Sequence, residues 1–145
     1  MKIIISLLFA AALPFLSFAQ STSVSDLQEK YKDKSDCFTL TMSGNILSMF
    51  SGSGDGGKET SKTTPSLRIL FVPKSSDGYT ARDMKRLKAE IKRQSFEEVM
   101  SVKSKNGNIK ALIKDSNGKM KEFVVLVDNT EEGFGALDFK GSLPD

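Results

Sequence analysis

Histidine is absent from this chain of 145 residues, and its absence narrows the chemistry that the protein can perform. Histidine is the side chain that proteins use most often as a general base, a proton carrier and a metal ligand near neutral pH. Without it, the serine and cysteine triads of hydrolases and most zinc hydrolase sites cannot form. The sequence therefore gives no basis for assigning a catalytic residue, a metal ligand or a cofactor site.

Cysteine and tryptophan are equally scarce. Cys37 is the only cysteine, so no disulfide can form within the chain and stability must come from packing. We interpret Cys37 as a small, half-buried strand residue, because no histidine is present to activate its thiol. Tryptophan is missing and only 2 tyrosines occur, so the aromatic platforms that usually hold a sugar ring are few.

The first 19 residues have the features of a secretory signal peptide. Lys2 precedes an apolar run from residue 3 to 16, and Ser17-Phe18-Ala19 supplies the small residues of a cleavage site before Gln20. We expect cleavage to leave one exported domain, residues 20–145, that is periplasmic or extracellular. Because Gln20 and not a cysteine follows the cleavage site, we expect no lipid anchor, and no transmembrane segment after signal removal.

The remaining chain is only mildly basic. Loss of Lys2 lowers the formal net charge from +3 to +2. Such a small excess of positive charge does not indicate a nucleic-acid surface.

Hydrophobic periodicity predicts an α+β domain. Ser23 with Asp26 and Thr80 with Asp83 have the spacing of helix capping boxes. The expected helices cover residues 23–31, 46–50, 58–64 and 80–94, with a flexible Gly/Ser-rich loop at 51–57. The expected strands cover 37–42, 67–72, 96–102, 109–113, 120–127 and 134–140. We predict a single two-layer domain with one mixed, mostly antiparallel sheet that ends in a β-meander, and with helices mainly on one face.

One predicted strand is apolar on both of its faces. The run Phe123-Val124-Val125-Leu126-Val127 leaves neither face polar. Such a strand belongs near the middle of a sheet. We expect helices to cover one side of it, and other parts of the chain or a partner to cover the other side.

The sequence resembles the family known as domain of unknown function 4252. The resemblance is carried by the segments 29–34, 38–43, 45–50, 66–70, 96–100 and 139–141, and it covers residues 26 to 142. It implies a small exported protein of Bacteroidota, often encoded near regulatory genes for envelope signalling. The family has no established activity, so the resemblance assigns no catalytic residue. Many of its members are lipoproteins, and Gln20 sets this chain apart from them.

Three polar segments suggest chemistry but have simpler interpretations. Residues 52–58 have the glycine and lysine spacing of a phosphate-binding loop, yet Glu59 occupies the position of the magnesium-binding hydroxyl, which favours a flexible loop. The pairs Glu97-Glu98 and Glu131-Glu132 could supply the carboxylates of a glycosidase, but aromatic platforms for a sugar are few, and Glu97 and Glu98, as adjacent strand residues, point to opposite faces. The acidic segment 128–133 matches no EF-hand and is typical of a turn.

The helix expected at 80–94 carries the strongest local charge asymmetry. Its basic residues outnumber Asp83 and Glu90 by four. They form a possible surface for an anionic partner, such as an envelope component or an acidic protein, although solvated surface helices often have the same pattern. These residues are Arg82, Lys85, Arg86, Lys88, Lys92 and Arg93.

Together, these patterns favour an exported, non-enzymatic binding or envelope-associated protein of unknown ligand, linked to envelope stress or signalling. The alternative is a cofactor-free, carboxylate-dependent hydrolase that acts on glycans. Two facing acids with raised pKa values in a deep pocket would favour the hydrolase, and a shallow surface would favour binding.

Overall fold

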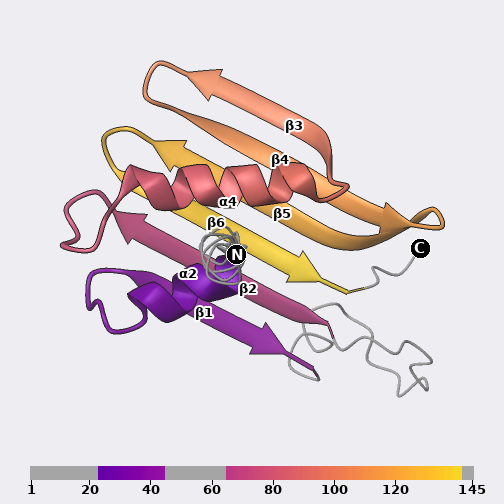
Figure 1. Ribbon diagram of the computed structural model, residues 1–145, viewed down its shortest axis with the longest axis horizontal. Helices are drawn as coiled ribbons and strands as arrows, with labels where there is room; N and C mark the ends of the chain where they lie inside the picture. The colour runs from indigo at the N-terminus through magenta and orange to yellow at the C-terminus, as the bar shows by residue number, and fades with distance from the viewer. Residues whose placement is uncertain (1–22, 45–64, 142–145) are drawn as a thin grey trace, which may run out of the picture.

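A computed structural model describes residues 23–44 and 65–141 of the chain. They form two α-helices and one six-stranded sheet (Figure 1). The expected signal peptide, the helices expected at 46–50 and 58–64, and the loop expected at 51–57 lie outside the described residues. In chain order the elements are α2 (Val24–Tyr31), β1 (Phe38–Ser43), β2 (Ser66–Pro73), α4 (Ala81–Arg93), β3 (Glu97–Ser104), β4 (Gly107–Ser116), β5 (Lys119–Asn129) and β6 (Gly133–Lys140).

The strands are ordered β1-β2-β6-β5-β4-β3 across the sheet. Each neighbouring pair is antiparallel, so the expectation of a mixed sheet was wrong. The reason is the path of α4, which carries the chain from β2 to the far edge of the sheet (Figure 1). β2 and β3 therefore run in the same direction without being neighbours, and β6 returns to pair with β2.

The sequence pattern located the strands correctly. All six expected strands are present, with bounds that differ by a few residues at each end. The hairpin between β4 and β5 turns at Asn117-Gly118, where φ is 57° and 77°. Positive φ at both turn residues is the geometry that favours Asn-Gly and fits the twist of the flanking strands. β5 lies between β4 and β6, which agrees with the interior position expected from its apolar sequence.

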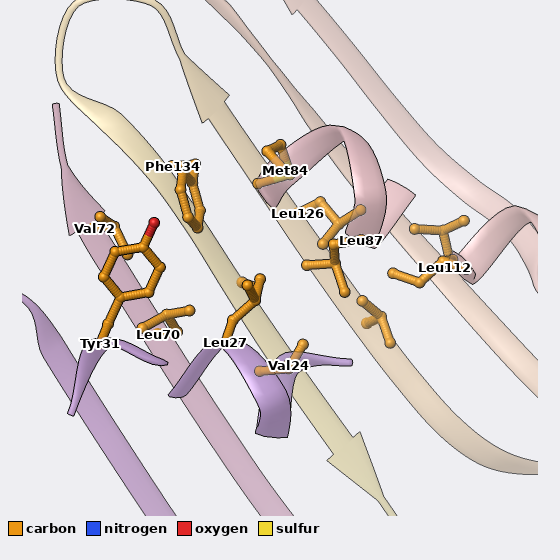
Figure 2. Packing of buried hydrophobic residues seen from close by; sticks show 13 residues of the cluster. Val24, Leu27, Tyr31, Leu70, Val72, Met84, Leu87, Leu112, Leu126 and Phe134 are labelled. Atoms are coloured by element: carbon orange, nitrogen blue, oxygen red, sulfur yellow. The ribbon is translucent and has the colours of Figure 1, made fainter. Parts of the chain in front are cut away.

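Both helices pack on the same face of the sheet (Figure 1). The side chains between them and the strands form the hydrophobic core, in which Tyr31, Val72 and Phe134 are fully buried (Figure 2). From α4, Met84, Leu87 and Ile91 face this core at helical spacing. None of the helices in the described ranges is both long and apolar enough to cross a membrane.

A buried glutamine attaches α2 to the edge of the sheet. The side-chain amide of Gln28 donates to the carbonyl oxygens of Leu40 on β1 and Ile69 on β2, each at 2.9 Å. Its Oε1 accepts hydrogen bonds from Thr41 and Arg68, both at 3.2 Å. All four contacts satisfy a polar group that would otherwise be costly to bury, so Gln28 fixes the position of α2 over β1 and β2.

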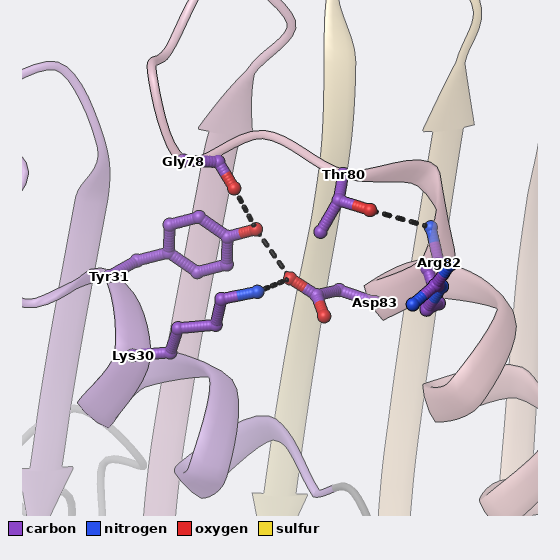
Figure 3. A network of polar contacts seen from close by, with 6 residues as sticks. All are labelled: Lys30, Tyr31, Gly78, Thr80, Arg82 and Asp83. Atoms are coloured by element: carbon purple, nitrogen blue, oxygen red, sulfur yellow. Dashed lines mark hydrogen bonds and ion pairs between the residues drawn. The ribbon is translucent and has the colours of Figure 1, made fainter.

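Asp83 joins the two helices and does not cap α4. At the start of α2 the expected capping box is present, since Ser23 and Asp26 bond to each other's backbone N–H. At the start of α4, Thr80 accepts from the N–H of Arg82, while Asp83 turns inward (Figure 3). Thr80 is therefore the N-cap, as expected, but the expected capping box was wrong, because the carboxylate of Asp83 accepts from Lys30 and Tyr31 of α2 instead of from the N-cap backbone.

The contacts of Asp83 form a compact network (Figure 3). Its Oδ2 accepts from the hydroxyl of Tyr31 at 2.5 Å and lies 2.6 Å from Nζ of Lys30. The same hydroxyl lies 2.9 Å from the carbonyl oxygen of Gly78. Burial raises the pKa of Tyr31 above its usual value, and the hydrogen bond and charge of Asp83 raise it further. Tyr31 therefore stays protonated and acts as a donor.

Replacing Asp83 with Ala should destabilise the domain by about 1–3 kcal/mol, because it leaves the buried Tyr31 hydroxyl without its main acceptor. Thermal and urea unfolding of the purified protein would measure the loss. Asp77→Ala, at an exposed loop position, is the matched control and should change stability by no more than about 0.5 kcal/mol. Equal stability of both variants would show that the network does not hold the helices together.

Candidate docking surface

The face of the sheet opposite the helices is almost entirely apolar. Residues that are directly paired in an antiparallel sheet point to the same side, so the strand registers define which side chains lie on this face. They align in three rows that each cross all six strands, and we call this surface the open face. The rows are Phe38-Phe71-Gly135-Val127-Ile109-Val102, Leu40-Ile69-Leu137-Val125-Ala111-Met100 and Met42-Leu67-Phe139-Phe123-Ile113-Glu97.

Side chains of the open face are far from fully covered. Phe38 is 53% exposed, Val102 48% and Met100 46%, and Phe71 and Ile109 are also exposed. By contrast, apart from Ala111, the buried apolar residues of the described ranges lie in the core beneath the helices. Among residues 23–44 and 65–141, one apolar side of the sheet is therefore covered by helices and the other is not.

The open face reaches the upper end of the size range of apolar patches on ordinary monomers. Six strands spaced about 4.8 Å apart and three rows spaced about 6.8 Å apart span about 600 Å². Monomeric soluble proteins rarely expose contiguous apolar patches above a few hundred Å², and larger ones usually mark interaction sites. Glu97, at one corner, is the only ionisable residue in the three rows.

The basic residues predicted as an anionic-partner surface lie on α4, over the opposite side of the sheet. Lys88 forms an ion pair with Asp128 of β5 at 2.8 Å, and Arg93 lies 3.5 Å from Glu90. The other four form no salt bridge with a described residue, and all four are exposed. They are Arg82, Lys85, Arg86 and Lys92.

One pair of acidic side chains was not foreseen from the sequence. Glu122 of β5 and Asp138 of β6 are diagonal neighbours on the helix-covered side of the sheet, since Asp138 pairs with Val124, two residues after Glu122. The pKa of Glu122 is raised to about 7, mainly by burial and further by hydrogen bonding to Asp138 and by the charge of Asp138, against the opposing effects of Lys140 and Lys114. Asp138 is buried, and its Oδ1 has no hydrogen-bond partner in the described part of the chain. A proton held on Glu122 would give this carboxylate a donor.

The other acidic residues that the sequence singled out do not converge. Glu97 and Glu98 pair with consecutive residues of β4 and so point to opposite faces, as expected, and Glu98 lies 3.6 Å from Nζ of Lys110. In the acidic turn, Oδ1 of Asn129 accepts from the backbone N–H groups of Glu131 and Glu132. Among the residues described here, no three His, Cys, Asp or Glu side chains cluster as metal ligands would.

Cys37 and the glycine-rich segment complete the candidates from the sequence. Cys37 is partly buried, as expected, but it immediately precedes β1 and is not a strand residue; its Sγ lies 3.5 Å from Oγ of Ser76. The segment that resembles a phosphate-binding loop lies outside the described residues.

The geometry defines the class of this protein as an antiparallel sheet domain with helices on one face and an apolar, uncovered second face. Comparison with known families then places it. The chain belongs to the family described as Domain of unknown function (DUF4252), whose family model matches residues 31–144. No curated protein and no solved structure matches the chain significantly.

Stability should fall as pH rises from about 4.5 to about 7. The pKa of Glu122 is raised from 4.5 to about 7 in the folded chain, so over this range the folded state binds a proton that the unfolded state has lost. Partial solvent access weakens the effect, and we expect a drop in Tm of about 3–5 °C between pH 5 and pH 8. Other groups also titrate, so the measurement is the difference between wild type and variants.

Glu122→Gln should remove this part of the pH dependence, because the amide donates to Asp138 at every pH. Glu131→Gln, at an exposed turn, is the control and should keep the wild-type slope. A Glu122→Gln protein with the same slope as wild type would contradict the shared proton.

If α4 binds an anionic partner, reversing its exposed cations should abolish the binding and leave the fold intact. Screening by salt should abolish wild-type binding in the same way. The variant is Lys85→Glu, Arg86→Glu and Lys92→Glu. The control variant has the same change in charge, placed at the β3–β4 and β4–β5 hairpins instead of on α4. Its substitutions are Lys103→Glu, Lys105→Glu and Lys119→Glu. Flotation with anionic vesicles at about 0.05 M and about 0.5 M salt measures the effect, and equal binding by both variants would argue against α4.

Proposed function

We propose that this protein is an exported, non-enzymatic binding protein whose docking surface is the open face. The observation that carries the proposal is the alignment of apolar side chains in three rows across all six strands. A soluble domain gains nothing from exposing so much apolar surface to water, whereas a partner that covers it gains the free energy of burial. The resemblance noted in the sequence supports placing this activity in the cell envelope.

The alternative, a carboxylate-dependent glycan hydrolase, has one observation in its favour, the raised pKa of Glu122 beside Asp138. Their spacing counts against it. Glycosidase carboxyl groups stand about 5 to 9.5 Å apart so that the sugar and a water molecule fit between them. Glu122 and Asp138 are in hydrogen-bonding contact, and Asp138 is buried, so no sugar fits between them. We therefore favour binding over hydrolysis.

Cross-linking in the cells that make the protein tests this function. Tagged full-length protein would be cross-linked in the intact envelope, recovered from outside the cytoplasm, and analysed by intact mass. We expect a chain that starts at Gln20 without lipid, and a cross-linked species that depends on the open face. The open-face variant is Phe71→Lys with Ile109→Lys, and the opposite-face control is Thr39→Lys with Ser101→Lys.

Both variants add two positive charges on strand residues that are exposed in the folded chain. The cross-linked species should persist in wild type and in the opposite-face control, and disappear in the open-face variant. Identical cross-linking of all three proteins would refute docking at the open face. A chain that retains Met1 would refute export by signal cleavage.

A further inference from the structure

We propose that a second copy of this chain covers the open face, so that two sheets pack face to face across a twofold axis. This inference rests on the proposed function, because it names the partner of the same surface. The result would be a sandwich of two six-stranded sheets, with the helices of both copies on the outside. Three properties of the open face favour a copy of the same chain as the occupant: its area, its lack of charge and its relief.

The area is sufficient for a stable dimer. Each copy contributes about 600 Å², so the two together bury about 1,200 Å², above the roughly 1,000 Å² that a specific interface needs. Sheets that pack face to face lie about 10 Å apart, with the side chains of both filling the space between. A second sheet can cover all three rows across the six strands. An extended peptide would cover only part of this surface.

The charge distribution permits contact between identical surfaces. In a twofold interface the same patch meets itself, so charges near its centre would face like charges. The open face has none there, because Glu97 lies at the corner formed by β3 and the last row. Within the described ranges, most charged residues lie instead on the helices, in loops and hairpins, and on the helix-covered side of the sheet.

The relief of the open face is also suited to a copy of itself. In an isologous interface the same patch has to be complementary to itself. In the first row the ring of Phe71 lies against Gly135, 3.6 Å from where a Cβ would stand, so the ring fills the space left by the missing side chain and no deep recess interrupts the row. In addition, the sheets of two copies twist with the same handedness. Two sheets can pack face to face with their strands nearly aligned when their twists match in this way.

Pairing through the β3 edge is a poorer route to a dimer. β3 forms one edge of the sheet, and a bulge between Glu98 and Met100 interrupts its ladder. Bulges of this kind hinder the addition of another strand. Edge pairing would also leave the open face exposed to water.

Sedimentation of the exported protein tests the proposal. Between about 0.1 and about 100 µM, wild type should change from the mass of one chain to that of two. The open-face variant, Phe71→Lys with Ile109→Lys, should raise the dissociation constant at least about 100-fold, because it places two charges inside the interface. The opposite-face control, Thr39→Lys with Ser101→Lys, should dimerise as wild type does. Cooperative melting would verify that each variant folds.

A second measurement locates the interface without altering the fold. Met100 is 46% exposed in a single chain, so peroxide should oxidise it several-fold more slowly at concentrations where the dimer forms. If the first variant fails to fold, Phe38→Lys with Val102→Lys replaces it, since both side chains are about half exposed.

The outcomes separate this inference from the proposed function. Monomeric protein at every concentration, together with a cross-linked species of different mass that needs the open face, would overturn the second copy and leave the docking surface standing. The same holds if monomeric protein floats with neutral phosphatidylcholine vesicles through the open face. If the protein is monomeric and the open-face variant cross-links as wild type does, both the second copy and the docking surface are overturned. If the protein dimerises and the open-face variant dimerises equally well, the dimer interface lies elsewhere and the second copy at the open face is overturned.

Discussion

The structure depends above all on the antiparallel pairing of β2 with β6. It is the junction at which the first part of the described chain, α2 with β1 and β2, meets the four strands that follow α4. Eight residue pairs from Ser66↔Lys140 to Pro73↔Gly133 set the register. Side chains alternate between the two faces along a strand. A slip of one residue between β2 and β6 would therefore put the apolar residues of β1 and β2 on the opposite face from those of β3 to β6. The continuity of the three apolar rows therefore depends on this register.

The two faces of the sheet differ in an unusual way. The covered face contains the hydrophobic core but also several buried polar residues, among them Gln28, Asp83 and Asp138. The uncovered face is more uniformly apolar. The polar residues beneath the helices have a clear role, because Gln28 and Asp83 fix α2 and α4 through specific hydrogen bonds. A face that binds a partner by apolar contact does not need such hydrogen bonds. A polar side chain there would be costly to bury if the partner left it without a hydrogen bond.

A sandwich of two copies would give the basic helix surface a new setting. Since α4 lies on the side away from the open face, dimerisation leaves its exposed cations accessible on both outer surfaces (Figure 1). The assembly would then present two identical basic surfaces, and a polyanionic partner could bind both at once. Linked binding of this kind raises the overall affinity without any new contact. The two surfaces of the chain are thus compatible with each other and not alternatives.

The sequence by itself determined the local structure. Alternation in the first strand and short apolar runs bounded by turn residues in the others located all six strands. The stripe of Met84, Leu87 and Ile91 located α4, and Ser23 with Asp26 marked the start of α2, because these signals depend only on near neighbours. It also indicated that β5 needs cover on both sides. Only the tertiary structure decided the strand order, the antiparallel pairing throughout, the inward turn of Asp83, and the contact between Glu122 and Asp138. The open face belongs with these, since its rows join residues as far apart as Phe38 and Val102, and such a surface exists only once long-range pairing has set the register.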